Sequence, residues 1–138
     1  MNDAARFAAA GAAAATAWSL LEPLDRRLFR YDYSDVAVLG KLVTRGRAWR
    51  PVGLALHAAN GAAFGLAYRE AKRRRGWSAF RLGMLEHLAL FPLSALVDRR
   101  HPARGTEGIP KLVTPRAFAQ ATVRHGIFGA LLGRLACR

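Results

Sequence analysis

The chain has 138 residues, a length that accommodates one domain. It is 52% hydrophobic, and its 22 Lys and Arg against 9 Asp and Glu give a formal net charge of +13. Its single cysteine, Cys137, excludes an internal disulfide and a cysteine-based metal site. The charges crowd between nearly uncharged apolar blocks, which favours contact with anionic lipid headgroups over nucleic acid binding, because the latter needs the charge on one soluble face.

The first apolar block predicts a helix over residues 7–24. Residues 7–21 are rich in alanine and short for a membrane span, and the block reaches Leu24 only through Glu22 and Pro23. A secretory signal peptide is the alternative interpretation of this block.

The loop over residues 22–50 contains a predicted short helix. Ser34 or Asp35 is a typical helix N-cap. Apolar residues then recur at helical spacing, namely Val36, Leu39, Leu42 and Val43. We expect this amphipathic helix to lie at the membrane interface.

The second apolar block, residues 51–68, is the strongest signal in the chain. Its sequence, PVGLALHAANGAAFGLAY, carries no formal charge, and arginines flank it on both sides, at Arg50 and Arg69 among others. A soluble helix of this length normally shows a charged face. At 1.5 Å per residue the block covers roughly 27 Å, close to the hydrocarbon thickness of a bilayer. It therefore predicts a membrane-spanning helix.

The third and fourth predicted spans cover residues 82–97 and 116–133. The third contains Pro92, which a membrane helix tolerates when neighbouring groups satisfy the freed carbonyl. The fourth follows Thr114-Pro115, a threonine cap with proline at the first helical position. Tryptophans at the boundaries of the blocks are typical of an aromatic belt: Trp18, Trp49 and Trp77.

These blocks together predict an all-α fold. We expect residues 1–138 to form a single domain, a four-helix transmembrane bundle with a short interfacial helix in the first loop. The connector over residues 69–81 is short and has the densest Lys and Arg, so we place it in the cytoplasm. Four spans then put both termini in the cytoplasm, and the chain is expected to be a multi-pass protein of the inner membrane.

Polar side chains within three of the predicted spans fall at a similar depth, in one layer about 9 Å thick at the helical rise per residue. Charged groups at membrane depth cost about 2.5–3.5 kcal/mol each, so they usually face the bundle interior and find partners. The candidate ligand-binding residues are His57, Asn60, Glu86, His87, Arg124 and His125. Two small-residue motifs on the same faces as histidines predict close helix packing, Gly61-x-x-x-Gly65 and Gly129-x-x-x-Gly133.

Three interpretations of this polar layer stay open. In the first, it is a hydrogen-bonded cluster that fixes the helix register, with Glu86 paired to Arg124. In the second, His57 and His125 hold a b-type haem, for which histidine is a standard ligand. In the third, histidine and glutamate form a proton or substrate path.

Two segments carry a resemblance to other proteins, LHAANGAAFGLAYREAKRR and EHLALFPLSALVDRRHP. With the alternation of Ala/Gly-rich spans, they resemble small four-helix integral membrane proteins of high-GC bacteria. The resemblance implies an inner-membrane location. It implies no activity and carries over no functional residue.

The sequence therefore predicts a small non-enzymatic accessory or scaffold protein of the membrane. We expect it to contact anionic lipid headgroups and to pack through its glycine faces against a second copy or a larger membrane complex. One alternative is a membrane protein that binds haem or another small ligand, or that conducts protons or a substrate. Another is a soluble basic helical protein that binds nucleic acid. No constellation of residues supports catalysis or a metal site, although an enzyme built on the polar layer stays open.

Overall fold

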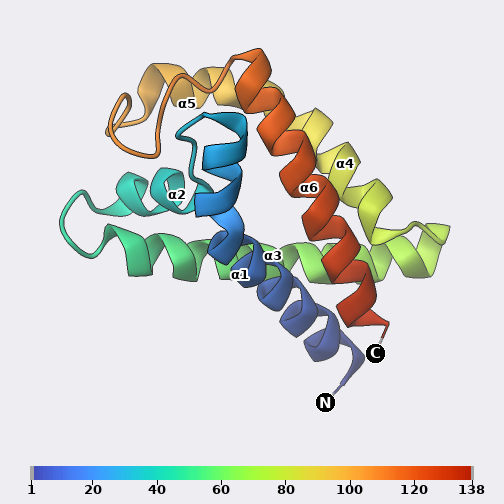
Figure 1. Ribbon diagram of the computed structural model, residues 1–138. Coiled ribbons are helices and arrows are strands. Elements are labelled where there is room, and N and C mark those ends of the chain that lie inside the picture. Colours follow the sequence, from blue (N-terminus) through green and yellow to red (C-terminus); the bar gives the residue numbers. More distant parts are fainter. Residues whose placement is uncertain (1, 138) are drawn as a thin grey trace.

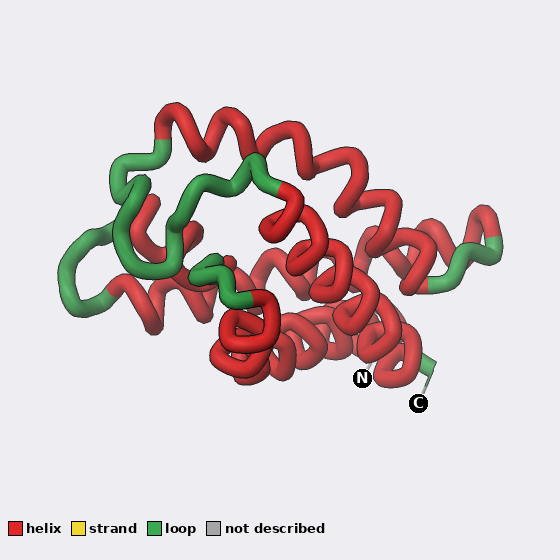
Figure 2. Tube along the Cα trace, turned by 45° about the horizontal axis from the view of Figure 1, so that its top comes forward, coloured by secondary structure: helices red, strands yellow, loops and turns green. Residues whose placement is uncertain are grey.

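The computed structural model describes residues 2–137, and all the regular structure in that range is helical (Figure 1). The elements in chain order are α1 (Asp3–Phe29), α2 (Asp35–Val43), α3 (Trp49–Arg75), α4 (Ala79–Leu90), the 3-10 turn η1 (Phe91–Leu93), α5 (Ser94–Arg100) and α6 (Pro115–Ala136). The all-α prediction is confirmed. The longer loops gather at the opposite end of the molecule from the short connector 76–78 (Figure 2).

Several helices begin at side-chain caps. The hydroxyls of Ser34, Ser78 and Thr114 each accept the backbone N–H of the residue three positions later. Each cap satisfies one of the N–H groups that the first turn of a helix leaves without an intrahelical partner. The caps therefore define the starts of α2, α4 and α6.

Two of the predicted spans differ from the structure near a proline. α1 continues through Pro23 as far as Phe29, beyond the predicted end at residue 24. Pro92 has no N–H to donate to the preceding turn. At this point the α-helix of the third predicted span ends, the 3-10 turn η1 follows, and α5 begins after it. The longer α1 carries Glu22 and Asp25 into the body of the fold, where both side chains are buried.

α1 and α3 pack backbone against backbone because glycines line their contact. A Cβ added to Gly11 would lie far inside van der Waals distance of the Gly61 carbonyl oxygen, and one on Gly65 would clash in the same way with the Phe7 carbonyl. The buried Ala15 of α1 lies against Gly61 in the same contact. Small residues permit this close approach of two helices.

α4 and α6 also meet at a glycine. A Cβ on Gly129 would lie 2.7 Å from the Cα of Phe80 and 2.9 Å from the Ala79 carbonyl oxygen. Gly133 lies beside Ala79 without such a clash. The glycine faces that we expected to meet a second copy or a partner protein therefore make their contacts within the chain.

The long helices run in alternating directions. Asp3 at the start of α1 forms an ion pair with Arg69 near the end of α3, and Lys72 lies 3.4 Å from the Sγ of Cys137 just after α6. α4 starts against the last turns of α6, at Gly129. Both ends of the described chain and the connector 76–78 therefore share one end of the molecule (Figure 1).

α2 lies between α3 and the loop 101–114. Gly40 of α2 and Gly53 of α3 allow the two backbones to touch. His101 fastens the loop, because its Nε2 donates to the Val38 carbonyl at 2.9 Å and its Nδ1 accepts the N–H of Ala103 at 3.1 Å. The interfacial position of α2 stays a prediction.

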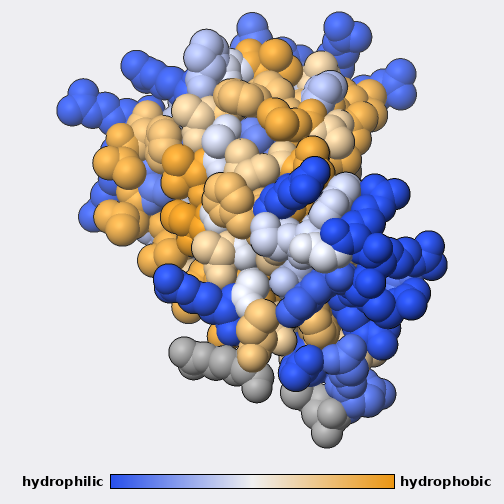
Figure 3. Space-filling view, turned by 90° about the vertical axis from the view of Figure 1, so that its right-hand side faces the viewer, coloured by the Kyte–Doolittle hydropathy of each residue, from blue (hydrophilic) through white to orange (hydrophobic). Residues whose placement is uncertain are grey.

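Large apolar side chains are distributed in the reverse of the usual soluble pattern. Within residues 2–137 the buried hydrophobic residues are mostly alanine, whereas 18 large apolar side chains are exposed. Most of the exposed ones belong to the long helical segments: Leu20, Leu21, Leu24, Leu28, Leu54, Leu56, Leu66, Phe80, Leu85, Leu88, Leu90, Leu93, Leu96, Phe118 and Val123. Figure 3 shows hydrophobic side chains gathered over the upper and left parts of one face, with hydrophilic ones at the lower right.

One helical segment in the described chain is long and apolar enough by itself to cross a membrane. This segment, Ala79–Arg100, consists of α4, η1 and α5. Only 11% of its most apolar stretch is buried in the structure. Its apolar surface is therefore largely uncovered by the rest of the chain.

Replacing Gly11 by alanine tests the contact between α1 and α3. The new methyl group meets the backbone of Gly61, which cannot turn away as a side chain would, so we expect a loss of about 1–3 kcal/mol in the free energy of unfolding. Thermal unfolding in detergent, followed by circular dichroism, measures it. Gly126→Ala is the matched control, since its methyl group would meet only the ring of Phe80, at 3.4 Å. Equal midpoints for the two variants would contradict the described packing.

Candidate functional site

Arg124 of α6 is the centre of a buried ion-pair network. Its side chain is only 3% exposed. Nε and Nη2 donate to the two carboxylate oxygens of Asp25 at 2.6 and 2.9 Å, and Nη1 donates to Asp35 at 2.7 Å. Nη2 also donates to the Tyr33 carbonyl at 2.7 Å, and Nη1 lies 3.8 Å from a carboxylate oxygen of Glu22. The guanidinium thus makes four hydrogen bonds with its five N–H donors.

The expected pairing of Glu86 with Arg124 is therefore wrong. Arg124 instead pairs with acidic groups of α1 and α2, which the extension of α1 past Pro23 brings within reach. The aromatic-belt prediction is also wrong for Trp18, which is 3% exposed and lies under the Arg124 guanidinium at 5.4 Å from the ring centroid.

Glu22 connects the same network to the start of α2. One carboxylate oxygen accepts the Ser34 hydroxyl at 2.6 Å, and the other accepts the backbone N–H of Asp35 at 2.9 Å. A carboxylate at a helix N-terminus is stabilised by the unpaired N–H groups and by the helix dipole. Glu22 of α1 therefore holds the first turn of α2 in place.

Asp35 stays ionised in this setting. Burial, the largest single effect, raises the pKa of its carboxyl, but the Arg124 guanidinium together with His57, the Tyr33 hydroxyl and His125 outweighs burial and lowers the pKa to about 2. Burial and the charge of Asp35 raise the pKa of Tyr33 well above its ordinary value. Tyr33 therefore stays protonated, and its hydroxyl donates a hydrogen bond to the Asp35 carboxylate.

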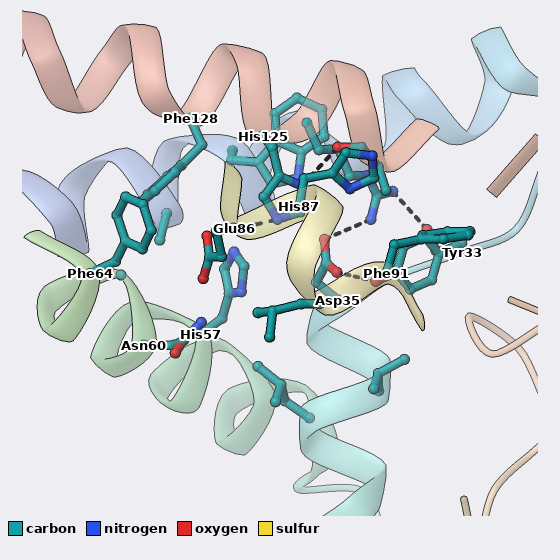
Figure 4. A pocket seen from close by; sticks show the side chains of 18 of the residues that line it. Tyr33, Asp35, His57, Asn60, Phe64, Glu86, His87, Phe91, His125 and Phe128 are labelled. Carbon is teal, nitrogen blue, oxygen red and sulfur yellow. Dashed lines mark hydrogen bonds and ion pairs between the residues drawn. The ribbon is translucent and has the colours of Figure 1, made fainter. Parts of the chain in front are cut away.

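A cavity of about 280 Å³ lies beside the network (Figure 4). Side chains from α1, α2, α3, α4 and α6 line it, together with Tyr33 before α2 and residues of the η1–α5 segment. Its polar lining residues are Trp18, Tyr33, Asp35, His57, Asn60, Glu86, His87, Ser94, Arg124 and His125. All six residues of the predicted polar layer thus border one cavity.

His125 and Glu86 face each other across part of this cavity. The Nδ1 of His125 lies 2.8 Å from the Ala121 carbonyl oxygen, which can only accept, so Nδ1 carries the proton. Its Nε2 then faces the Glu86 carboxylate at 3.9 Å. In the neutral imidazole both of these groups are acceptors, so a proton or a donor group is needed between them.

The other two cavity histidines, His87 and His57, differ in burial and in hydrogen bonding. His87 is 1% exposed, and its Nε2 lies 2.9 Å from the Thr122 hydroxyl, which donates to the Phe118 carbonyl at 2.8 Å. His87 is therefore a hydrogen-bonded core residue of the contact between α4 and α6. His57 is half-buried and points into the cavity from α3, near Asn60 (Figure 4).

The described residues form no group of metal ligands, and the cavity is small for the predicted haem. Within residues 2–137, no group of three or more His, Cys, Asp or Glu side chains is arranged to hold a metal ion. An iron on Nε2 of His125 would meet the Glu86 carboxylate. The cavity of about 280 Å³ also falls just below the range of about 300–1,000 Å³ that is typical of sites for drug-sized ligands.

Acidic residues of the network are the part that sequence reasoning missed. In the sequence, Glu22 lies at the boundary of the first block, Asp25 lies in the predicted loop, and Asp35 is a typical helix-start residue. The signal was present, because Trp18, Glu22 and Asp25 recur at helical spacing and so share one face of α1.

No family model, curated protein or solved structure matches this chain. The resemblance to small bacterial membrane proteins therefore remains an expectation from the sequence.

Replacing Arg124 by lysine tests the network without removing its positive charge. A lysine ammonium cannot reproduce the paired bonds to Asp25 together with those to Asp35 and Tyr33. We expect the free energy of unfolding to fall by about 3 kcal/mol, since each hydrogen bond to a charged group contributes about 1.5–3 kcal/mol. Thermal unfolding in detergent measures the loss. Arg134→Lys, an exposed position on the same helix, should leave the midpoint unchanged.

The pKa of Asp35 predicts an acid-sensitive contribution to stability. Because the folded-state pKa lies below the ordinary value of 3.8, the contribution is complete above that value and is lost as the pH falls through about 2. Its size is about 2 kcal/mol by the conversion of pKa into free energy. We expect Asp35→Asn to be less stable at neutral pH and to lose less stability on acidification. A parallel pH profile for the two proteins would contradict this prediction.

Proposed function

We propose that this protein is a multi-pass membrane protein whose helices enclose a binding cavity for a small polar ligand. The observation that carries the proposal is the cavity, whose lining includes groups that still need hydrogen-bond partners, inside a bundle whose outer surface is rich in leucine.

The membrane part of the proposal rests on the reversed apolar pattern. Exposed leucines on α1, α3, α4 and α5 would cost free energy in water, whereas lipid covers such side chains. The four predicted spans 7–24, 51–68, 82–97 and 116–133 contain only two Lys or Arg residues, Arg124 and, at the first position of the last span, Arg116. The Arg124 guanidinium is 3% exposed and paired, which is what membrane depth demands of a charge.

The alternating helix directions support the proposed topology of four spans in the inner membrane. Both ends of the described chain and the basic residues 72–75 gather at one end of the bundle. The positive-inside rule favours the cytoplasm for that end. The arginines at the opposite end, including Arg99 and Arg100, would contact anionic headgroups of the other leaflet.

We favour ligand binding over the scaffold role predicted from the sequence. A scaffold would use the glycine faces for a partner, but Gly11, Gly61, Gly65 and Gly129 are occupied by contacts within the chain. The cavity, by contrast, is bordered by a carboxylate that makes no direct hydrogen bond within residues 2–137, that of Glu86. Buried polar groups normally find partners, and a bound molecule would supply them.

Extraction tests the membrane location. We expect the protein to stay in the membrane fraction in high salt and at alkaline pH and to leave it only in detergent, because insertion is not screened by ions. A basic protein that binds only nucleic acid or headgroups would be released by salt alone. Release by salt without detergent would overturn the proposed insertion.

A further inference from the structure

We propose that the cavity takes a small organic cation that carries N–H donors, such as a primary ammonium compound. This inference rests on the proposed function, because it names the class of ligand for the same cavity. It follows from the hydrogen-bonding capacity and the charge of the groups that line the cavity.

The Glu86 carboxylate and the Nε2 lone pair of neutral His125 line the cavity and receive no direct hydrogen bond within residues 2–137. The Asp35 carboxylate also lines the cavity, and it already accepts from Arg124 and Tyr33. The one permanent cation in the lining, Arg124, makes four hydrogen bonds to protein groups. A ligand with its own N–H groups and positive charge would complete this set, whereas an anion would face the two carboxylates.

The gap between Glu86 and His125 is where such a cation fits. The two acceptors stand 3.9 Å apart, and within residues 2–137 the only recorded partner of the Glu86 carboxylate is this histidine. A separation of 3.9 Å is too long for a direct hydrogen bond between the Glu86 carboxylate and the His125 ring. An ammonium group can donate one N–H to the carboxylate and another to the imidazole nitrogen.

Aromatic side chains supply the rest of the site. Phe64, Phe91 and Phe128 line the cavity together with Leu90. The rings of Phe64 and Phe128 meet edge to face, 5.3 Å apart, and stand near Glu86 (Figure 4). Aromatic faces attract cations and also bury apolar surface, so an ammonium on a short apolar body matches both parts of the lining.

Other titratable groups contribute to the charge in and near the cavity. His57 from α3 lines the cavity opposite α6, and His87 from α4 is bonded to Thr122. Asp25 and Glu22 of α1 lie behind Arg124 and add negative charge. With neutral histidines, the carboxylates near the cavity therefore exceed the single guanidinium.

Titration of three matched probes tests this inference on the full-length protein in detergent. The probes are benzylammonium, benzyl alcohol and benzoate, which share one ring and differ in charge. Side-chain NMR of ¹⁵N-labelled histidine follows the binding, because three of the four histidines line the cavity. The fourth, His101, is bonded in the loop outside the cavity and serves as the internal control.

We expect benzylammonium to shift the His125 and His57 signals saturably and the other two probes to bind at least tenfold more weakly. Glu86→Gln should reduce the affinity for benzylammonium about tenfold or more, the loss typical of a hydrogen bond to a charged group. Glu70→Gln, an exposed carboxylate paired with Arg73 outside the cavity, is the matched control and should bind normally.

Two results would overturn the inference in distinguishable ways. If benzyl alcohol or benzoate binds as tightly as benzylammonium, or if Glu86→Gln binds benzylammonium normally, the ligand class is wrong while a binding cavity remains. If no probe moves the cavity histidines, both the ligand class and the proposed binding function fail. The unfolding midpoint of Glu86→Gln shows whether that variant is folded.

Discussion

The structure depends on one buried guanidinium and the carboxylates that surround it. A charge in a low-dielectric interior is tolerated only when it is paired and hydrogen-bonded, and Arg124 meets that condition with partners from two other elements. Asp25 fixes α1 against α6, and Asp35 fixes the start of α2 against both. Glu22 strengthens the arrangement by holding the same turn through its backbone N–H groups. The wall of the cavity formed by Tyr33 and Asp35 is therefore a consequence of this pairing.

The sequence was sufficient to predict the helices but not their polar contacts. Uncharged blocks between basic connectors predict helices directly, and Ser34 and Thr114 mark two helix starts because their caps depend on local chemistry. Partners of Arg124 depend on tertiary structure, since Asp25 lies 99 residues away in the chain. A first helix that ends at Leu24 leaves that carboxylate in the following loop. The depth estimate grouped six residues that border one cavity, because it needed only the helical rise.

The polar layer separates into two parts with different chemistry. Around Arg124 and His87, the hydrogen-bonding groups largely have partners, as the structural interpretation requires. Around Glu86, His125 and His57, few partners are present, as a binding site requires. A structural cluster and a ligand site were alternatives at the level of the sequence, because residue types and depth do not distinguish a satisfied group from an unsatisfied one. On the proposed function, the first part holds the second in position.

The glycine contact between α1 and α3 also has a mechanical consequence. Its atoms are backbone atoms at close approach, with no long side chains that could change rotamer and absorb a shift. The α1–α3 pair is therefore the rigid side of the cavity. On the opposite side, η1 interrupts the regular α-helical hydrogen bonding of the α4–α5 segment at Pro92, and Phe91 of that turn borders the cavity. On the proposed function, we therefore expect any adjustment of the cavity to a bound molecule at this turn rather than at α3.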